Sequence, residues 1–330
     1  MKRALAFALA FALSSAPPAA RAWGTSGHRI IGEVAMQSLP DDIPAFLTAP
    51  GAVATIAQLG TEMDRLKGAG YSFDRDEDPA HYVNVGDDRR IAGTVALSAL
   101  PSDMEAYAAA LREGGSDPFK AGYLPYAIAD GWQVLRKDFA YWRAFDFLAR
   151  SASARDRAAF TSERVLREQV LIYQLGMWSH FVGDGSQPLH VSVHYNDRGI
   201  HAPFEGAFVR AHVTAAAVAK LVPVGGPRPP VKTIDERELL QEIGLYLRAG
   251  NDEEPQLYAI ARRTGGFKRA TPEAVAFATA RVADGARELR DFIVLAWDDS
   301  VHESVGYPEM PVTDILSGKI HPTPADFSRD

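Results

Sequence analysis

The chain has 330 residues and no cysteine, and its 42 Asp and Glu residues outnumber its 35 Lys and Arg residues, which gives a net charge of −7. Without cysteine it can form no disulfide and offers no thiolate ligand, so any bound metal must be held by histidine and carboxylate side chains. The acidic balance disfavours nucleic-acid binding through a basic stripe, and bound phosphate groups would have to be neutralised by captured metal ions instead.

Residues 1–22 have the features of a secretory signal peptide. Two basic residues at positions 2 and 3 precede an apolar run over 4–13 and an Ala-Arg-Ala cleavage signal over 20–22. Cleavage after this signal would make Trp23 the new N-terminus and would place the protein in the periplasm or outside the cell. No later apolar run reaches the roughly 20 residues that a membrane span needs.

Helical periodicity dominates the rest of the chain. Apolar residues at helical spacing, with helix-start and helix-stop residues at several boundaries, predict helices over 28–39, 101–112, 126–148, 162–182, 236–248 and 272–297. No segment of alternating β-branched residues is longer than a few positions. The sequence therefore predicts an all-α fold. It also predicts a single multi-helix domain over 23–310, a loop over 221–232 and a C-terminal tail over 311–330.

Histidine and carboxylate residues recur at helical spacing in the second half of this domain. His180 and Asp184 are four residues apart, so both project from one face of a helix, and His201 and Glu205 repeat that spacing. His190 follows the end of the first of these helices. A single pair of this kind is more often a solvated pair of helix residues. Two pairs together with a third histidine indicate a metal site.

Four upstream residues could join this site. A free α-amine at Trp23 could chelate a metal together with its own carbonyl oxygen, and His28 lies close enough in sequence to add an imidazole. Taken alone, this segment fits equally well with an ordinary first residue and a surface histidine. Asp64 and His81 would supply one further carboxylate and one further imidazole. Histidine and carboxylate ligands without cysteine suit zinc in a catalytic site.

These motifs resemble those of a known family. Trp-Gly-x-x-Gly-His, Asp-Arg, His-Tyr-Val-Asn and His-Phe-Val-Gly-Asp-x-x-Gln-Pro-Leu-His are similar to motifs of the trinuclear zinc phosphoesterases. That superfamily comprises secreted single-strand nucleases, which are also 3′-nucleotidases, and bacterial zinc-dependent phospholipases C. The matches extend from Trp23 to Glu205, and only the block over 180–190 is specific by itself. The resemblance implies an all-α fold of the phospholipase C and nuclease type.

The resemblance also implies three zinc ions per chain and their ligands. The expected ligands are Trp23 and His28 for the first ion, Asp64, His81 and His180 for the second, Asp184 as a bridge between these two, and His190, His201 and Glu205 for the third. By the family's mechanism, a hydroxide that bridges two zinc ions attacks phosphorus, and Asp64 orients it. The third zinc ion would neutralise the phosphate oxygens and the leaving group.

Three further residues would contact the substrate if the resemblance holds. Lys67 stands where the nucleases carry an arginine near the phosphate, so the resemblance places it with Asp64 as a catalytic residue. Tyr82 and Asn84 stand where the nucleases stack and hydrogen-bond a base. The alternatives are that Lys67 is a solvated helix lysine, that Tyr82 packs in the core, and that Asn84 caps a turn.

The substrate class is less sharply indicated. The opening motif and His-Tyr-Val-Asn favour a nuclease that hydrolyses single-stranded DNA or RNA, with 3′-nucleotides as a further substrate. The spacing of His201 and Glu205 is that of the phospholipases, so phospholipid headgroups are the alternative substrate. His212 stands roughly where the nucleases place a later ligand, but Ala216 four residues on cannot ligate.

Two other features complete the sequence-based expectations. The stretch between His81 and His180 is an enlargement relative to the nucleases and could reshape the substrate cleft. No obligate protein partner is evident. A helical binding protein with a decayed site is a third reading, which the presence of every expected ligand type disfavours.

Overall fold

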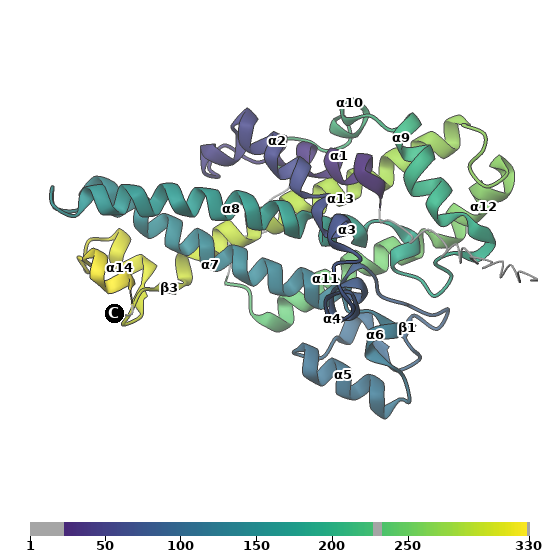
Figure 1. Cartoon of the computed structure of the whole chain (residues 1–330), viewed down its shortest axis with the longest axis horizontal. Helices are drawn as coiled ribbons and strands as arrows, with labels where there is room; N and C mark the ends of the chain where they lie inside the picture. Colours follow the sequence, from purple (N-terminus) through teal and green to yellow (C-terminus); the bar gives the residue numbers. More distant parts are fainter. Residues whose placement is uncertain (1–22, 227–232, 329–330) are drawn as a thin grey trace, which may run out of the picture.

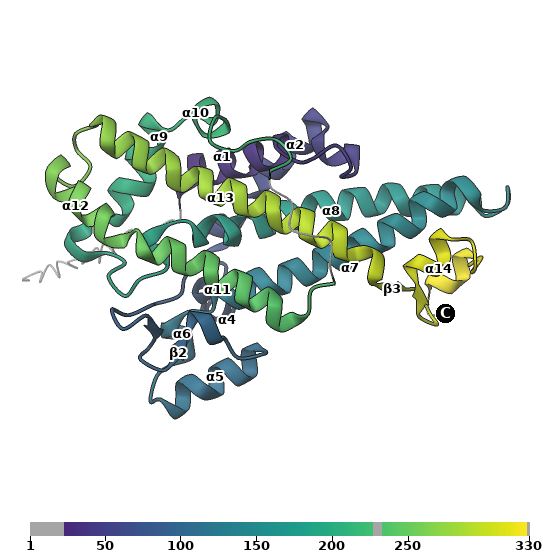
Figure 2. The ribbon, with the colours of Figure 1, turned by 180° about the vertical axis from the view of Figure 1, so that it is seen from behind.

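The computed structural model describes residues 23–226 and 233–328 of the chain. The fold is all-α, as the sequence predicts, and the strands within these ranges form only two short hairpins. Two long helices, α7 (Leu124–Ser151) and α8 (Arg157–Gly185), form a helical hairpin along the long axis of the molecule (Figure 1). A third long helix, α13 (Pro272–Asp299), packs against both, as the view from behind shows (Figure 2).

Shorter elements complete the described fold. The helices are α1 (Gly24–Gln37), α2 (Pro50–Leu59), α3 (Glu62–Leu66), α4 (Tyr71–Glu77), α5 (Met104–Glu113), α6 (Pro118–Ala121), α9 (Val209–His212), α10 (Ala215–Ala219), α11 (Glu236–Asp252), α12 (Glu254–Thr264) and α14 (Val312–Leu316). Antiparallel pairs are formed by β1 (Arg90–Ile91) with β2 (Val95–Ala96), and by β3 (Ser304–Val305) with β4 (Met310–Pro311).

All of the predicted helices are present, with shifted ends. The helices predicted over 126–148 and 162–182 are longer in the structure, as α7 and α8. The helix predicted to begin at 101 begins instead at Met104, because the Asp103 side chain caps it by accepting a hydrogen bond from the Ala106 amide at 2.8 Å. Helices α2 and α12 were absent from the sequence-based prediction.

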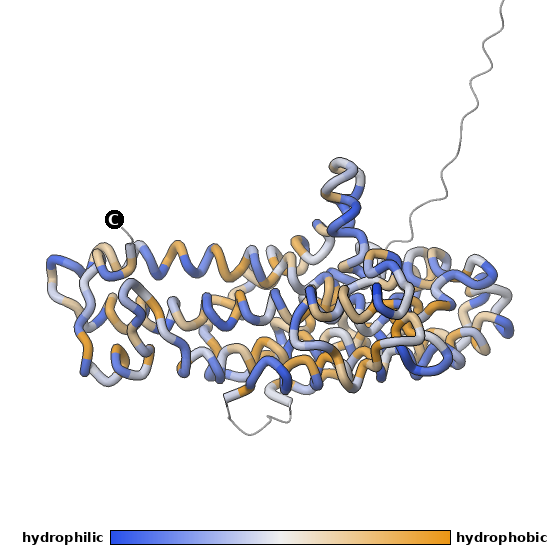
Figure 3. The backbone as a smooth tube through the Cα atoms, turned by 90° about the horizontal axis from the view of Figure 1, so that it is seen from below, coloured by the Kyte–Doolittle hydropathy of each residue, from blue (hydrophilic) through white to orange (hydrophobic). Residues whose placement is uncertain are grey.

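The main hydrophobic core is built on the inward faces of the long helices. In α8, apolar residues at helical spacing are fully or nearly fully buried: Leu171, Leu175, Trp178 and Val182. Hydrophilic and hydrophobic residues alternate along the tubes of the long helices in Figure 3, which is the pattern of helices with one face in a core. The core thus fixes the position of the C-terminal turns of α8.

A second hydrophobic cluster, which we call the distal core, lies where the tip of the α7–α8 hairpin meets α14 (Figure 1). It consists of Ala140, Ala144, Phe145, Leu148, Phe160, Val305, Met310, Val312 and Ile315. Val312 and Ile315 belong to the predicted C-terminal tail and are completely buried. Part of that tail is therefore a packed element of the fold.

Some sequence predictions fall outside the described residues. The signal peptide over 1–22 lies there entirely, and the loop predicted over 221–232 is described only as far as residue 226. Among the described helices, none combines the length and the apolar character needed to cross a membrane.

Candidate metal centre

The predicted ligands converge near the C-terminal end of α8. His180 and Asp184 lie on its last turns, and the chain then enters a short 3-10 turn over Pro188–His190. The others lie in or directly before helices α1 and α3, a 3-10 turn over Asp78–His81 and a π-helical turn over Pro203–Phe208, with His201 two residues before that turn. All of these residues except Asp64 are buried, although most have polar side chains. Buried polar residues from so many elements mark a candidate functional site, and π-helical turns are frequent at such sites.

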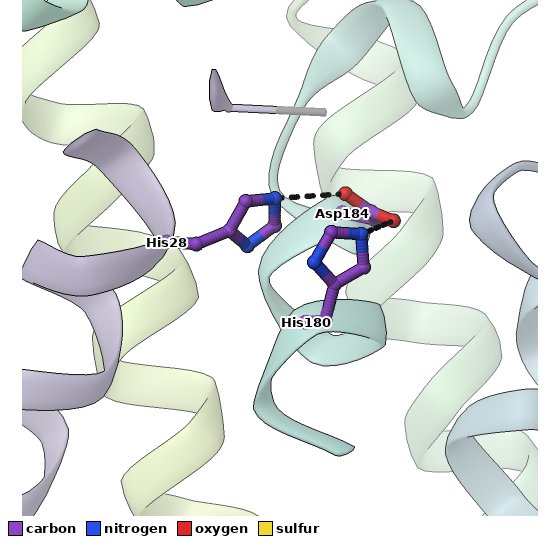
Figure 4. A group of neighbouring side chains, drawn as sticks. All are labelled: His28, His180 and Asp184. Carbon is purple, nitrogen blue, oxygen red and sulfur yellow. Dashed lines mark ion pairs between the residues drawn. The ribbon is translucent and has the colours of Figure 1, made fainter. Parts of the chain in front are cut away.

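His28, His180 and Asp184 form the first group, with ligand atoms within 4.8 Å of one another. His28 Nε2 lies 3.5 Å from Asp184 Oδ1, and His180 Nε2 lies 3.4 Å from Asp184 Oδ2 (Figure 4). The two imidazole rings stack with 4.0 Å between their centroids. Gly183 permits this approach of α1 to α8, because a Cβ atom there would lie 2.9 Å from His28 Nδ1. Each carboxylate oxygen of Asp184 thus faces a different histidine, as a bridging carboxylate requires.

Trp23 is hydrogen-bonded to the helix turn that carries Asp184. Its indole nitrogen donates hydrogen bonds to the Gly183 carbonyl at 2.8 Å and to the Ser186 hydroxyl at 2.9 Å. The side chain is completely buried and packs against the ring of Phe204. The residue predicted to become the N-terminus is therefore anchored at the first group. Ligation through a freed α-amine stays a prediction.

Asp64, His81 and His180 form the second group, again with ligand atoms within 4.8 Å of one another. Asp64 Oδ1 lies 4.0 Å from His180 Nε2. The rings of His81 and His180 meet edge to face, with 4.9 Å between their centroids. Because His180 belongs to both the first and the second group, the two groups are contiguous.

His190, His201 and Glu205 form the third group. Glu205 Oε2 lies 2.8 Å from His201 Nε2, without the alignment of a hydrogen bond, and 3.7 Å from His190 Nε2. Gln187 is completely buried and donates a hydrogen bond to Glu205 Oε2 at 3.2 Å, while its own side-chain oxygen accepts one from the Leu189 amide at 2.9 Å. Gln187 therefore fixes the orientation of the Glu205 carboxylate.

Backbone carbonyls orient three of the imidazole rings. The Nδ1 atom of His180 lies 2.9 Å from the Gly60 carbonyl oxygen, and that of His190 lies 2.6 Å from the His81 carbonyl oxygen. The Nδ1 atom of His81 lies 3.1 Å from the Glu77 carbonyl oxygen. A carbonyl can only accept, so in each ring Nδ1 carries the proton. When the ring is neutral, Nε2 is then left with a lone pair, which is how protein histidines are held for metal binding.

The unpaired atoms of these groups fit a metal ion. Most of the buried side-chain nitrogen and oxygen atoms that lack a hydrogen-bond partner among the described residues belong to His28, His81, His180, Asp184, His190, His201 and Glu205. Buried polar atoms are nearly always paired, so this convergence needs a partner. Two ligands of a tetrahedral zinc ion lie roughly 3.4 Å apart. The separations of Asp184 from His28 and His180, 3.5 and 3.4 Å, match that spacing.

Burial keeps the central histidines neutral. It lowers the pKa of His28 and of His180 to about 4, and it lowers the pKa of His81 well below its ordinary value. At neutral pH these imidazoles therefore carry no charge, and the neutral ring is the form that binds a metal.

Burial acts to raise the pKa of each carboxylate of the centre, but neighbouring groups outweigh burial in two of them. Burial raises the pKa of Asp184 to about 6. Burial also acts to raise the pKa of Asp64, but His180 and the Lys67 ammonium outweigh it and hold that pKa well below its usual range. In Glu205, contacts with His190 and His201 likewise outweigh burial and lower the pKa.

The pKa of His190 is shifted by the negative charge of these carboxylates. Burial alone would lower its pKa, but Asp184 and Glu205 outweigh burial and raise the pKa to about 9. The centre therefore favours a positive charge next to its carboxylates. A metal dication would supply that charge in place of the His190 proton.

A cavity of about 430 Å³ opens beside the second and third groups, a size typical of small-molecule sites. It is lined by Lys67, Asp78, His81, Tyr82, Asn84, Lys120, Leu189, His190, Tyr195 and His201. The three residues predicted to contact substrate, Lys67, Tyr82 and Asn84, are thus on its wall. Lys67 is half-buried and donates a hydrogen bond to Asp64 Oδ1 at 2.7 Å, so it is an inward-facing residue rather than a freely solvated lysine.

Tyr82 and Asn84 also form hydrogen bonds that connect two segments of the cavity wall. The Tyr82 hydroxyl donates a hydrogen bond to the Phe119 carbonyl at 2.9 Å, and the Asn84 amide nitrogen donates one to the Lys120 carbonyl at 2.7 Å. Both side chains therefore have the local structural contacts that the alternative readings predict, while both still line the cavity. Their contact with a substrate base stays a prediction.

His212 does not join the metal centre in the described part of the chain. It is exposed at the end of α9, and its ring lies 4.8 Å from that of Phe208. It belongs to none of the three ligand groups. The geometry brings together His201 and Glu205 instead.

Some residues at the site gave no signal in the sequence. Lys120 and Tyr195 line the cavity, although neither lies in a motif that spacing identifies. Gln187 stands within a recognised motif, but its contact with Glu205 depends on the path of the chain between η4 (Pro188–His190) and η6 (Pro203–Phe208).

Comparison with known proteins gives little further information. No family model matches the chain, and no curated protein matches it. Among solved structures, alpha toxin from Clostridium absonum is similar, with 11% sequence identity and a TM-score of 0.48 over 86% of this chain and 67% of that chain. With a likeness this distant, the chemistry of the site has to be inferred from its own residues.

Proposed function

We propose that the protein is an exported hydrolase of phosphoester bonds that uses three zinc ions and acts on single-stranded nucleic acids. The observation that carries this proposal is the convergence of buried, unpaired imidazole and carboxylate atoms in three contiguous or neighbouring groups. A set of histidine and carboxylate donors without cysteine suits catalytic zinc. When bound, zinc ions would polarise phosphoryl oxygens and lower the pKa of a coordinated water.

The residues that would hold the ions follow from the three groups. His28 and Asp184, with the backbone of Trp23, would hold one ion. Asp64, His81 and His180 would hold the second with the other oxygen of Asp184, and the third group would hold the last ion. The carbonyls of Gly60, His81 and Glu77 would keep three of the rings aimed at these positions.

Asp64 and Lys67 would act on the substrate side of the centre. Asp64 stays ionised because its pKa is held low, so it can accept a hydrogen bond from the attacking water and orient it. Lys67 lies on the cavity wall and is paired with Asp64, which places a positive charge where a phosphate oxygen would bind.

The choice of nucleic acid rests on the cavity wall. Tyr82 offers an aromatic ring for sequence-tolerant stacking of a base, and Asn84 offers a polar side chain beside it. A zinc-dependent phospholipase C is the second candidate. The observation that favours it is that His201 and Glu205, whose spacing resembles the phospholipases, are the pair that meets His190.

One assay separates these functions. The protein processed after Ala22 is incubated with Zn²⁺ on single-stranded DNA and, in parallel, on phosphatidylcholine, with and without a chelator. We expect chelator-sensitive cleavage of the DNA. Release of the headgroup alone would favour the phospholipase, and hydrolysis of neither by a zinc-loaded protein would refute the proposed function.

A further inference from the structure

The cavity has an outer wall that the ligand motifs do not supply. This wall is the segment around α6, within the long stretch between His81 and His180, and Lys120 is its residue on the cavity. The segment thus contributes to the cavity beside the metal centre, together with Tyr82 and Asn84 from the start of the same stretch. Figure 1 shows α5, α6 and β1 grouped on one side of the long helices.

The α6 segment is held against the residues that follow His81. The Asn84 backbone amide donates a hydrogen bond to the Ala121 carbonyl at 2.7 Å, and the Asn84 side chain donates one to the Lys120 carbonyl at 2.7 Å. Gly122 has a φ of 80°, and a Cβ atom there would lie 2.2 Å from the Tyr82 carbonyl oxygen, so only glycine permits this contact. The backbone of Lys120 therefore has a fixed position relative to Tyr82 and Asn84.

The two lysines on the cavity wall differ in their partners. The Lys67 ammonium is paired with Asp64 at 2.7 Å, at the second ligand group. Lys120 is exposed and forms no ion pair with any residue in the described ranges. Asp78 is the one carboxylate on the wall outside the ligand groups. Burial raises the pKa of Asp78, and the Lys67 ammonium opposes this shift. The positive charge of Lys120 is therefore available to a bound anion.

We propose that Lys120 is a specificity-determining residue that binds a second phosphate group of the substrate, the phosphodiester next to the one held at the metal centre. This inference rests on the proposed hydrolase function and narrows it to substrates with successive phosphodiesters, which are single-stranded nucleic acids. A substrate with one phosphodiester gains nothing from Lys120, and a choline headgroup would meet a like charge there.

The test compares substrates that differ in their number of phosphates. The zinc-loaded protein is assayed on a short oligothymidylate and on the dinucleotide thymidylyl-thymidine, which has a single phosphodiester. For Lys120→Ala, we expect the KM for the oligothymidylate to rise about fivefold at low salt, with kcat and the KM for the dinucleotide unchanged. The slope of log KM against log salt concentration should become shallower by about 0.7, the value for one lost phosphate contact on a single strand.

Two further variants serve as controls. Lys120→Arg keeps the charge and should keep the salt slope of the wild type. Arg112→Ala removes an exposed positive charge from α5, in the same part of the fold but outside the cavity lining, and should leave both KM values and the slope unchanged. Equal zinc content and circular dichroism spectra would show that the variants are folded.

The remaining outcomes would overturn the proposed role of Lys120, and they distinguish its failure from failure of the proposed function. Equal changes for the two substrates, or no change for either, would show that Lys120 binds no second phosphate while the hydrolase function stands. Hydrolysis of phosphatidylcholine but not of oligothymidylate would overturn the inference and the choice of nucleic acid together. Hydrolysis of neither would refute the proposed function itself.

Discussion

The two ends of the α7–α8 hairpin differ in what they bury. Near its tip, the distal core is apolar, and aromatic rings meet there with 4.9 Å between the centroids of Phe145 and Phe327 and 5.9 Å between those of Phe160 and Phe327. At the other end, the last turns of α8 bury His180 and Asp184, whose ligand atoms have no hydrogen-bond partner among the described residues. The same helix therefore serves stability at one end and a binding site at the other.

This difference has an energetic meaning. Burying apolar side chains stabilises a fold, whereas a buried polar atom without a partner costs about 1–3 kcal/mol. A cluster of such atoms lowers the stability of the metal-free protein unless a ligand satisfies them. We therefore expect changes at the metal centre to act on metal binding and hydrolysis, and changes in the distal core to act on stability alone.

The largest effect is expected from Asp184→Asn, because Asp184 faces both His28 and His180. Loss of one carboxylate charge at a bridging position should weaken two zinc sites and reduce hydrolysis at least about a hundredfold. The measurement is turnover together with zinc content by mass spectrometry. Near-normal turnover with full zinc content would refute the three-ion arrangement.

Asp138→Asn is the matched control for this variant. Asp138 is also a buried aspartate, but it lies on α7 and is paired with Arg167. Its replacement should lower the free energy of unfolding and leave the zinc content unchanged.

A smaller effect, on stability alone, is expected from Phe160→Ala. Phe160 is completely buried in the distal core, so its truncation should lower the free energy of unfolding of the zinc-loaded protein by about 3 kcal/mol. Denaturant titration measures this change, and kcat and zinc content should stay those of the wild type. Loss of zinc from the folded variant would show that the two ends are coupled.

The last prediction is a pH dependence of the metal-free protein, which is spread over more than two pH units. His28 and His180 have a pKa of about 4 when folded and about 6.5 when unfolded, so the unfolded chain binds more protons in this window. Stability is therefore lost as pH falls from about 6.5 towards 4, by about 1.4 kcal/mol per pH unit for each extra proton. Asp184, with a pKa raised to about 6, opposes this trend with one proton, while His81 reinforces it.

Denaturant titrations of the chelated protein between these pH values measure the slope. His180→Gln removes one of the titrating groups and should make the dependence shallower. A metal-free protein that becomes more stable on acidification in this range would contradict the buried, neutral state of the histidines.

Much of the fold follows from local sequence signals. The starts of α11 and α13 were predicted at the residues where they occur, since Asp235 and Thr271 cap them and Pro272 suits the first turn. Helix α12 was missed because it follows α11 after a single residue, and the sequence offers no loop to separate them. The packing of Val312 and Ile315 into the distal core depends on contacts with α7, which no local pattern encodes.

The ligand groups could also be predicted from the sequence, for a different reason. Paired histidines and carboxylates at helical spacing, together with the motif resemblance, named the residues of the three groups, and within each group the structure brings the ligand atoms within 4.8 Å of one another. The cavity wall was not predictable in the same way. Lys120 reaches it only because the α6 segment binds back to Tyr82 and Asn84 across a long sequence separation. Contacts of that kind depend on tertiary packing rather than spacing.

The most direct test of the metal centre is anomalous X-ray scattering at the zinc absorption edge, from crystals of the protein processed after Ala22 and grown with zinc. The three-ion arrangement predicts three peaks: one between Trp23, His28 and Asp184, one among Asp64, His81 and His180, and one among His190, His201 and Glu205. A single peak, or none within these groups, would contradict it.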